Sequence, residues 1–133
     1  MDVAASEFNV DGKYDLVKWA DKPNIVTGEE LTAIYLDWTE RSPIVSIEDP
    51  FDQMDIKNRA HCVAKMHKHV QIVAEDLSVT QKESIEWIIK ETGATALLLN
   101  INQCGSITYS FDAVKTDLSD KWAVIASHRS GET

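Results

Sequence analysis

The sequence predicts an α/β fold, in which short buried strands alternate with helices and pair in parallel. Four apolar runs of strand length occur in the 133 residues, at 43–47, 70–74, 96–99 and 122–126. These runs are continuous, which is typical of strands covered on both faces. The segments before and between them have the spacing of amphipathic helices. Strands that alternate with helices form right-handed βαβ units, so we expect one parallel sheet.

A capping box and an apolar stripe predict the first helix. Thr27 and Glu30 have the spacing at which each side chain accepts a hydrogen bond from the other residue's backbone N–H. The apolar residues behind them recur at helical spacing, as Leu31, Ile34, Tyr35 and Trp38. We therefore expect a helix that begins after Thr27 and buries this stripe.

Three further segments are predicted to be helical. The segment from about Asp55 to His69 is weakly amphipathic, through Ile56, Ala60, Val63 and Ala64. The next has a second capping box, an isoleucine stripe and a glycine stop, formed by Thr80, Glu83, Ile85, Ile88, Ile89 and Gly93. The last carries Ile107, Phe111, Val114 and Leu118. In the stretch from Asn9 to Asn24 the apolar residues follow neither helical nor strand spacing, so we expect an irregular loop there.

Composition and charge disfavour several classes of protein. With 44% hydrophobic and 26% charged residues the chain has the make-up of a single globular domain. Its formal net charge of −9 disfavours binding to nucleic acid or to an anionic membrane. We expect a cytoplasmic protein, because the sequence shows neither a run of about 18 apolar residues nor a secretory signal. Cys62 and Cys104 lie far apart, so we expect buried or unreactive thiols.

Polar side chains follow each of the four predicted strands. In chain order they are Glu48 and Asp49, Glu75 and Asp76, Asn100, and finally Ser127, His128 and Arg129. The carboxyl ends of parallel strands meet at the mouth of an α/β barrel, and they line a crevice in a doubly wound sheet. We therefore expect these side chains to share one site under either architecture.

The acids of this set predict a bound cation. Carboxylates that converge repel one another and are costly to desolvate unless a cation or protons neutralise them. Oxygen ligands without cysteine favour Mg²⁺ over zinc. In a competing interpretation one acid of each pair caps the following helix, which we expect for Asp49 and Asp76.

Several motifs, in order along the whole chain, resemble the enolases. They are D-V-A-A-S-E-F at 2–8, G-K-Y-D-L at 12–16, S-I-E-D-P-F-D-Q at 46–53, L-L-L at 97–99, N-Q at 102–103 and S-H-R-S-G-E-T at 127–133. The resemblance implies that residues 1–133 are one segment from the centre of an enolase C-terminal domain, roughly half of a TIM-like α/β barrel. The implied activity is that of a glycolytic lyase, the Mg²⁺-dependent and reversible dehydration of 2-phosphoglycerate to phosphoenolpyruvate. The parent protein is implied to be a cytoplasmic homodimer.

The resemblance also implies roles for residues at matching positions. Asp2, Glu48 and Glu75 match metal ligands, although enolases usually carry Asp where Glu75 stands. His128 matches a histidine that faces the substrate, while Arg129 and Ser130 match residues that hold its phosphate. An arginine suits this role because its guanidinium meets phosphate oxygens in a bidentate fork.

Asn100 departs from the family pattern. It stands where enolases carry the lysine that removes the proton α to the substrate carboxylate, and an amide cannot act as that base. The loss of a positioned general base costs about 10²–10⁴ in rate. A whole barrel also needs about 250 residues and eight strands. We therefore expect a partial chain that is nearly inactive alone.

Two other hypotheses stay open at this point. An enolase-like protein could keep the metal and anion site for binding or scaffolding without catalysis, which Asn100 and Glu75 favour. An independent doubly wound domain could bind a phosphorylated ligand without catalysis. The sequence does not decide between a fragment of an enolase and a truncated paralogue.

Overall fold

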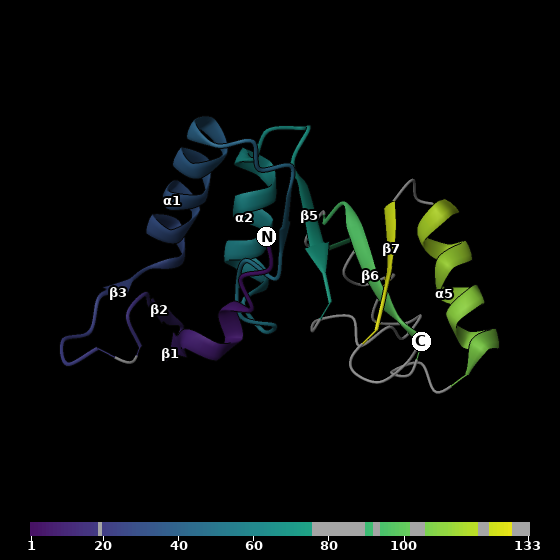
Figure 1. Cartoon of the computed structure of the whole chain (residues 1–133), viewed down its shortest axis with the longest axis horizontal. Coiled ribbons are helices and arrows are strands. Elements are labelled where there is room, and N and C mark those ends of the chain that lie inside the picture. The colour runs from purple at the N-terminus through teal and green to yellow at the C-terminus, as the bar shows by residue number, and fades with distance from the viewer. Residues whose placement is uncertain (19, 76–89, 92–93, 102–105, 120–122, 129–133) are drawn as a thin grey trace.

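The computed structural model contains one parallel sheet, one small antiparallel sheet and flanking helices (Figure 1). The structure describes residues 1–18, 20–75, 90–91, 94–101, 106–119 and 123–128. None of the helices in these ranges is long and apolar enough to cross a membrane.

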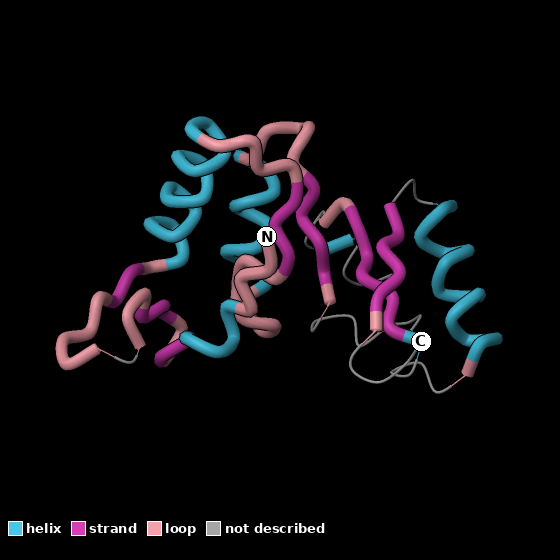
Figure 2. The backbone as a smooth tube through the Cα atoms, in the orientation of Figure 1, coloured by secondary structure: helices cyan, strands magenta, loops and turns pink. Residues whose placement is uncertain are grey.

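The parallel sheet confirms the predicted α/β class. Its strands are β4 (Ser46–Glu48), β5 (Gln71–Ala74), β6 (Ala96–Asn100) and β7 (Ala123–Ser127), and their order in space is their order in sequence. In Figure 2 the sheet lies between the α1–α2 helix pair and α5. A doubly wound sheet contains a point where the strand order reverses. The described strands show no reversal, which is the order of a barrel wall and disfavours the doubly wound alternative.

Helix α1 (Gly28–Arg41) begins with the predicted capping box. Glu30 N donates to Thr27 Oγ1 at 3.2 Å, and Thr27 N donates to Glu30 Oε2 at 2.8 Å. Leu31 and Tyr35 of the stripe are buried, and the Tyr35 hydroxyl donates to Pro50 O at 2.8 Å. Trp38 lies at the margin of the buried face, because its side chain is 40% exposed. The predicted helix is therefore confirmed, with a narrower buried face than its stripe suggested.

Helix α2 (Ile56–Lys65) buries a different face from the one that its apolar residues predicted. Asp55 caps it by accepting a hydrogen bond from Asn58 N at 3.2 Å. Its fully buried residues are Arg59 and Cys62, whereas Ile56, Ala60 and Val63 are half-buried and Ala64 is exposed. The predicted face considered apolar residues alone, whereas Arg59 is buried because it has partners in the core, Asp49 and the carbonyl of Phe51.

The other two helix predictions have different outcomes. Helix α5 (Ile107–Ser119) forms beside β6 and β7, but Ile107 and Phe111 of its stripe are 65% and 62% exposed. Of the segment predicted from Thr80 to Gly93, only residues 90–91 are described, and they are helical.

The stretch from Asn9 to Asn24 is not irregular throughout, so that prediction was wrong. After a 3-10 turn, η1 (Ala5–Phe8), the chain forms an antiparallel sheet of β1 (Asn9–Val10), β2 (Lys13–Asp15) and β3 (Ile25–Val26). Asp11 and Gly12 both have positive φ, 51° and 79°, which a two-residue hairpin turn of type I′ requires. The strands are too short to show an alternating pattern, and only the Asp-Gly dipeptide signals the hairpin.

The main core joins this small sheet to the helices and to the first parallel strands. Its members include Ala5, Tyr14, Leu31, Tyr35, Ile47, Phe51, Cys62 and Ile72. Tyr14 and Tyr35 each pack edge to face against Phe51, with ring centroids 5.7 Å and 5.9 Å from that of Phe51. A second cluster of Val73, Ala96 and Leu98 lies within the parallel sheet. Together they fix the strands whose carboxyl ends carry the polar side chains.

Candidate functional site

A pocket of about 300 Å³ lies at the carboxyl ends of the parallel strands. It is lined by Asp2, Glu48, Glu75, Leu98, Asn100, Ser127 and His128. Polar residues from all four strand ends therefore meet in one place, together with Asp2 from the start of the chain. Asp76, Arg129 and Ser130 lie outside the described residues.

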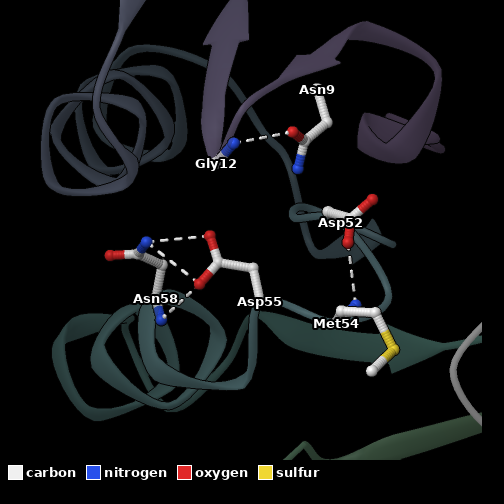
Figure 3. A pocket seen from close by; sticks show the side chains of 6 residues that line it. All are labelled: Asn9, Gly12, Asp52, Met54, Asp55 and Asn58. Atoms are coloured by element: carbon white, nitrogen blue, oxygen red, sulfur yellow. Dashed lines mark hydrogen bonds between the residues drawn. The ribbon is translucent and has the colours of Figure 1, made fainter.

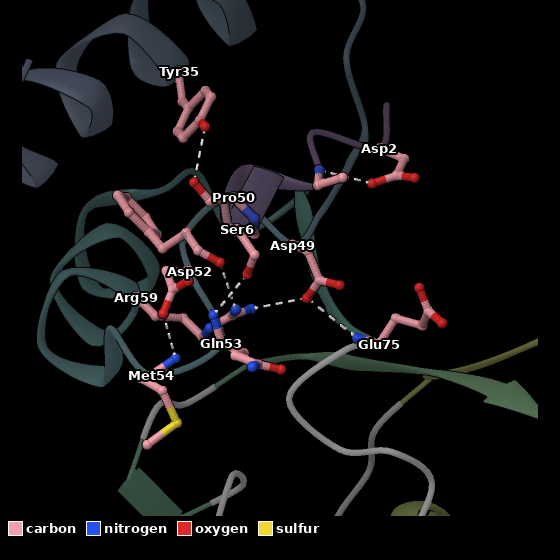
Figure 4. Close-up of polar contacts among 12 residues, drawn as sticks. Asp2, Ser6, Tyr35, Asp49, Pro50, Asp52, Gln53, Met54, Arg59 and Glu75 are labelled. Atoms are coloured by element: carbon pink, nitrogen blue, oxygen red, sulfur yellow. Dashed lines mark hydrogen bonds and ion pairs between the residues drawn. The ribbon is translucent and has the colours of Figure 1, made fainter. Parts of the chain in front are cut away.

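Backbone pairing places Asp2 beside Glu48. The first residues run parallel to β4, with Glu48 N donating to Met1 O at 2.8 Å and Val3 N donating to Glu48 O at 3.0 Å. The Asp2 carboxylate accepts a hydrogen bond from Ala4 N at 3.0 Å (Figure 4). Because Asp2 and Glu48 lie on adjacent extended segments, their carboxylates face the same pocket.

The carboxylates of the pocket influence one another. Burial, followed by the charges of Asp2, Asp49 and Glu75, raises the pKa of Glu48 from its usual 4.5 to about 7. The N-terminal ammonium opposes the shift. The pocket thus concentrates negative charge, and a cation there would relieve it.

A family comparison accounts for this geometry. The model of the enolase C-terminal TIM barrel domain matches residues 1–133. This chain belongs to the enolase C-terminal barrel family. Barrel enzymes place their chemistry where the strands end, which is where the pocket lies in this enolase-family chain.

The pocket residues of this enolase-family chain suit Mg²⁺ in their chemistry. Asp2, Glu48 and Glu75 supply oxygen donors, and a divalent cation would offset their mutual repulsion. As they stand, no three His, Cys, Asp or Glu side chains among the described residues are close enough together to hold a metal ion. The three acids therefore share a pocket without forming a ready-made ligand set.

Asn100 is buried at the end of β6 and contacts one of these acids. Its side chain is 1% exposed, and Asn100 Nδ2 donates to Glu75 Oε1 at 2.9 Å. The amide thus acts as a hydrogen-bond donor to a carboxylate, which stabilises the carboxylate's negative charge. An amide cannot act as a base toward a proton on carbon.

Asp49 does not cap the following helix, so that prediction was wrong. The cap of α2 is Asp55, whereas Asp49 is 3% exposed and lies 3.4 Å from Arg59 Nη1. Asp49 Oδ1 also accepts a hydrogen bond from Glu75 N at 3.3 Å. Sequence reasoning missed Arg59; the available signal was its helical spacing to Cys62 and Met66, which are both buried.

A larger pocket, of about 420 Å³, lies between the small sheet and the start of α2 (Figure 3). The acids of this pocket accept hydrogen bonds from other residues of the protein. Asp55 accepts hydrogen bonds from the Tyr14 hydroxyl and from Asn58, and Asp52 accepts one from Met54 N. We therefore place the candidate site at the strand ends.

Proposed function

We propose that the strand-end pocket is an enolase-type site for Mg²⁺ and 2-phosphoglycerate. The reaction it would serve is the reversible dehydration of 2-phosphoglycerate to phosphoenolpyruvate. One observation carries the proposal: Asp2, Glu48 and Glu75, from three separate segments, line one pocket in a chain of the enolase barrel family.

Each pocket residue has a proposed task. Asp2, Glu48 and Glu75 would hold the Mg²⁺, which when bound supplies positive charge beside the substrate oxygens. His128 lines the same pocket and would face the substrate. Arg129 and Ser130 directly follow it in sequence and would hold the phosphate.

Asn100 limits what this site does catalytically. The dehydration begins when a base removes the proton α to the carboxylate, and the amide of Asn100 supplies no base. We therefore propose that this chain turns over substrate at least about 10²–10⁴ times more slowly than an enolase with its lysine.

The Asn100–Glu75 hydrogen bond favours a second candidate function, which is binding without catalysis. The bond fixes the amide as a donor to a proposed metal ligand. In that case the pocket binds the cation and a phosphorylated anion for a scaffolding or regulatory purpose.

Calorimetric titration tests the proposal. We expect 2-phosphoglycerate to bind the protein only when Mg²⁺ is present, and we expect Glu48→Gln to weaken this binding. Asp37→Asn is the control, since Asp37 is exposed on α1 and is not among the pocket residues. Absence of Mg²⁺-dependent binding in the unaltered protein would contradict the proposal.

An activity assay separates the two candidates. Phosphoenolpyruvate formation is followed by ultraviolet absorbance for Asn100→Lys, with Asn100→Gln as the control. Turnover gained only by the lysine variant supports an enolase site with a single lost base. Binding without any gain in turnover supports the non-catalytic candidate.

A further inference from the structure

We propose that the buried Asp49–Arg59 pair positions the carboxylates of the strand-end pocket. It holds the three segments that carry Asp2, Glu48 and Glu75 in fixed relation, and it thereby sets the affinity of the pocket for a divalent cation. The affinity part of this inference rests on the proposed function.

Asp49 connects all three segments. It directly follows Glu48, and its own N–H donates to Val73 O of β5 at 3.1 Å. Its carbonyl accepts a hydrogen bond from Ala5 N, at 3.1 Å, in the segment that begins with Asp2. Its side-chain Oδ1 accepts the N–H of Glu75 at 3.3 Å (Figure 4). A shift of Asp49 would therefore move every carboxylate of the proposed metal site.

The backbone of Asp49 is held in an uncommon conformation. Its φ is 39°, in the left-handed region that is sterically unfavourable for a residue with a Cβ. Such conformations persist where the surroundings over-determine them. The contacts of Asp49 to β5, Ala5 and Glu75 hold the residue in this conformation, in which its carboxylate points into the interior.

Arg59 supplies the charge that keeps this carboxylate buried. Its side chain is fully buried, with Nη1 3.4 Å from Asp49 Oδ1 and Nη2 donating to Phe51 O at 3.0 Å. Removal of one partner from a buried ion pair leaves an uncompensated charge, which is strongly unfavourable. Without Arg59, the Asp49 carboxylate would lose the partner that keeps it in its buried position.

Arg59 is a positioning residue, because it acts on the pocket through Asp49. It comes from α2 and is not among the residues that line the pocket. Its removal would leave each proposed ligand in the sequence and would change only where that ligand is held. Partners that orient metal ligands typically change metal affinity by about 10- to 100-fold when they are removed.

The first test needs no metal. Hydrogen–deuterium exchange is measured for the amides of Glu75 and Ala5 in Arg59→Met, in Arg59→Lys and in Cys62→Ala. Cys62 is the matched control, since it is equally buried on the same helix. We expect faster exchange at both amides in Arg59→Met than in the control, and partial protection in Arg59→Lys. Equal exchange in Arg59→Met and Cys62→Ala would overturn the inference.

The second test measures affinity for Mn²⁺, as a paramagnetic substitute for Mg²⁺, in the same variants. We expect Arg59→Met to lower the affinity about 10- to 100-fold and Cys62→Ala to leave it unchanged. Unchanged affinity in a folded Arg59→Met protein would overturn the affinity part. If the unaltered protein binds no Mn²⁺, the proposed function and the affinity part fail together, and the exchange data decide the positioning part separately. Should Arg59→Met not fold, Asp49→Asn takes its place with the same expectations.

Discussion

The side-chain amide of Asn100 donates a hydrogen bond to Glu75 Oε1 across 2.9 Å, joining the ends of β6 and β5 inside the pocket. Both residues are buried, so this bond lies largely out of water. It places a neutral donor against a proposed metal ligand. The relationship makes position 100 a sensitive probe of the pocket.

We expect Asn100→Asp to destabilise the protein by about 1–3 kcal/mol at neutral pH, because it replaces a donor by a second carboxylate facing Glu75. The loss should shrink as the pH falls, because protonation of either acid removes the repulsion. Urea denaturation at neutral and at acidic pH measures the free energy of unfolding of each variant. Asn100→Leu is the control, since it removes the bond without adding charge, so its cost should vary less with pH than that of Asn100→Asp. A cost for Asn100→Asp that does not vary with pH would contradict the contact.

The pKa of Glu48, raised to about 7, predicts a pH-dependent stability. Between pH 4.5 and about 7 the folded protein keeps a proton that the unfolded chain releases. The contribution of Glu48 to the free energy of unfolding is therefore most favourable below pH 4.5 and is lost as the pH rises through about 7.

Glu48→Gln should remove this dependence. Because Glu48 is only partly buried, solvent screening reduces its effect to about 1 kcal/mol, or roughly 3–5 °C in Tm. We expect the variant to melt higher than the unaltered protein at about pH 8 and equally at about pH 4. Thermal scans in metal-free buffer measure both. A lower Tm for the variant at the higher pH would contradict the charge repulsion.

Gly28 is expected to tolerate no side chain while Asn58 is present. A Cβ at position 28 would lie 2.1 Å from Asn58 Cγ, and the Asn58 amide is held by two hydrogen bonds to Asp55, at 3.0 and 2.8 Å. We therefore expect Gly28→Ala to cost about 1–3 kcal/mol. In an Asn58→Ala background the same change should be neutral or favourable, because alanine is the better helix former. Urea denaturation of the four proteins gives the coupling, and equal costs in both backgrounds would show that the clash is relieved elsewhere.

The capping box of α1 should contribute measurably to stability. Thr27→Ala removes the acceptor for Glu30 N and should lower the free energy of unfolding by about 1 kcal/mol. Thr27→Ser keeps the hydroxyl and serves as the control. An alanine variant as stable as the serine variant would show that the cap contributes nothing here.

Cys62 should be unreactive in the folded protein. Its side chain is fully buried, and burial raises the pKa of its thiol to about 11, so little thiolate exists at neutral pH. In a Cys104→Ser background, where Cys62 is the remaining cysteine, we expect no thiol labelling until denaturant is added. Rapid labelling in native buffer would show that α2 opens readily.

Local patterns in the sequence were sufficient for much of the fold. Short-range spacing encodes a capping box, a helical stripe or a strand, because neighbours along the chain are also neighbours in these elements. The capping box at Thr27, the parallel strands and the gathering of Glu48, Glu75 and Asn100 at one edge were all predicted in this way. The hairpin at Asp11 was missed because its strands are too short to show the alternation of apolar and polar residues that indicates a strand.

The sequence by itself determined the class of fold, the family and the place of the candidate site, since each follows from residue spacing and from motifs. Only the tertiary structure decided that Arg59 is buried against Asp49 and that Asn100 is bonded to Glu75. These pairs join residues from different elements, and the free energy of burying a charge or an amide depends on which partner the fold brings within reach. A local pattern can indicate that Arg59 is buried, but it does not identify the partner of Arg59 or of Asn100.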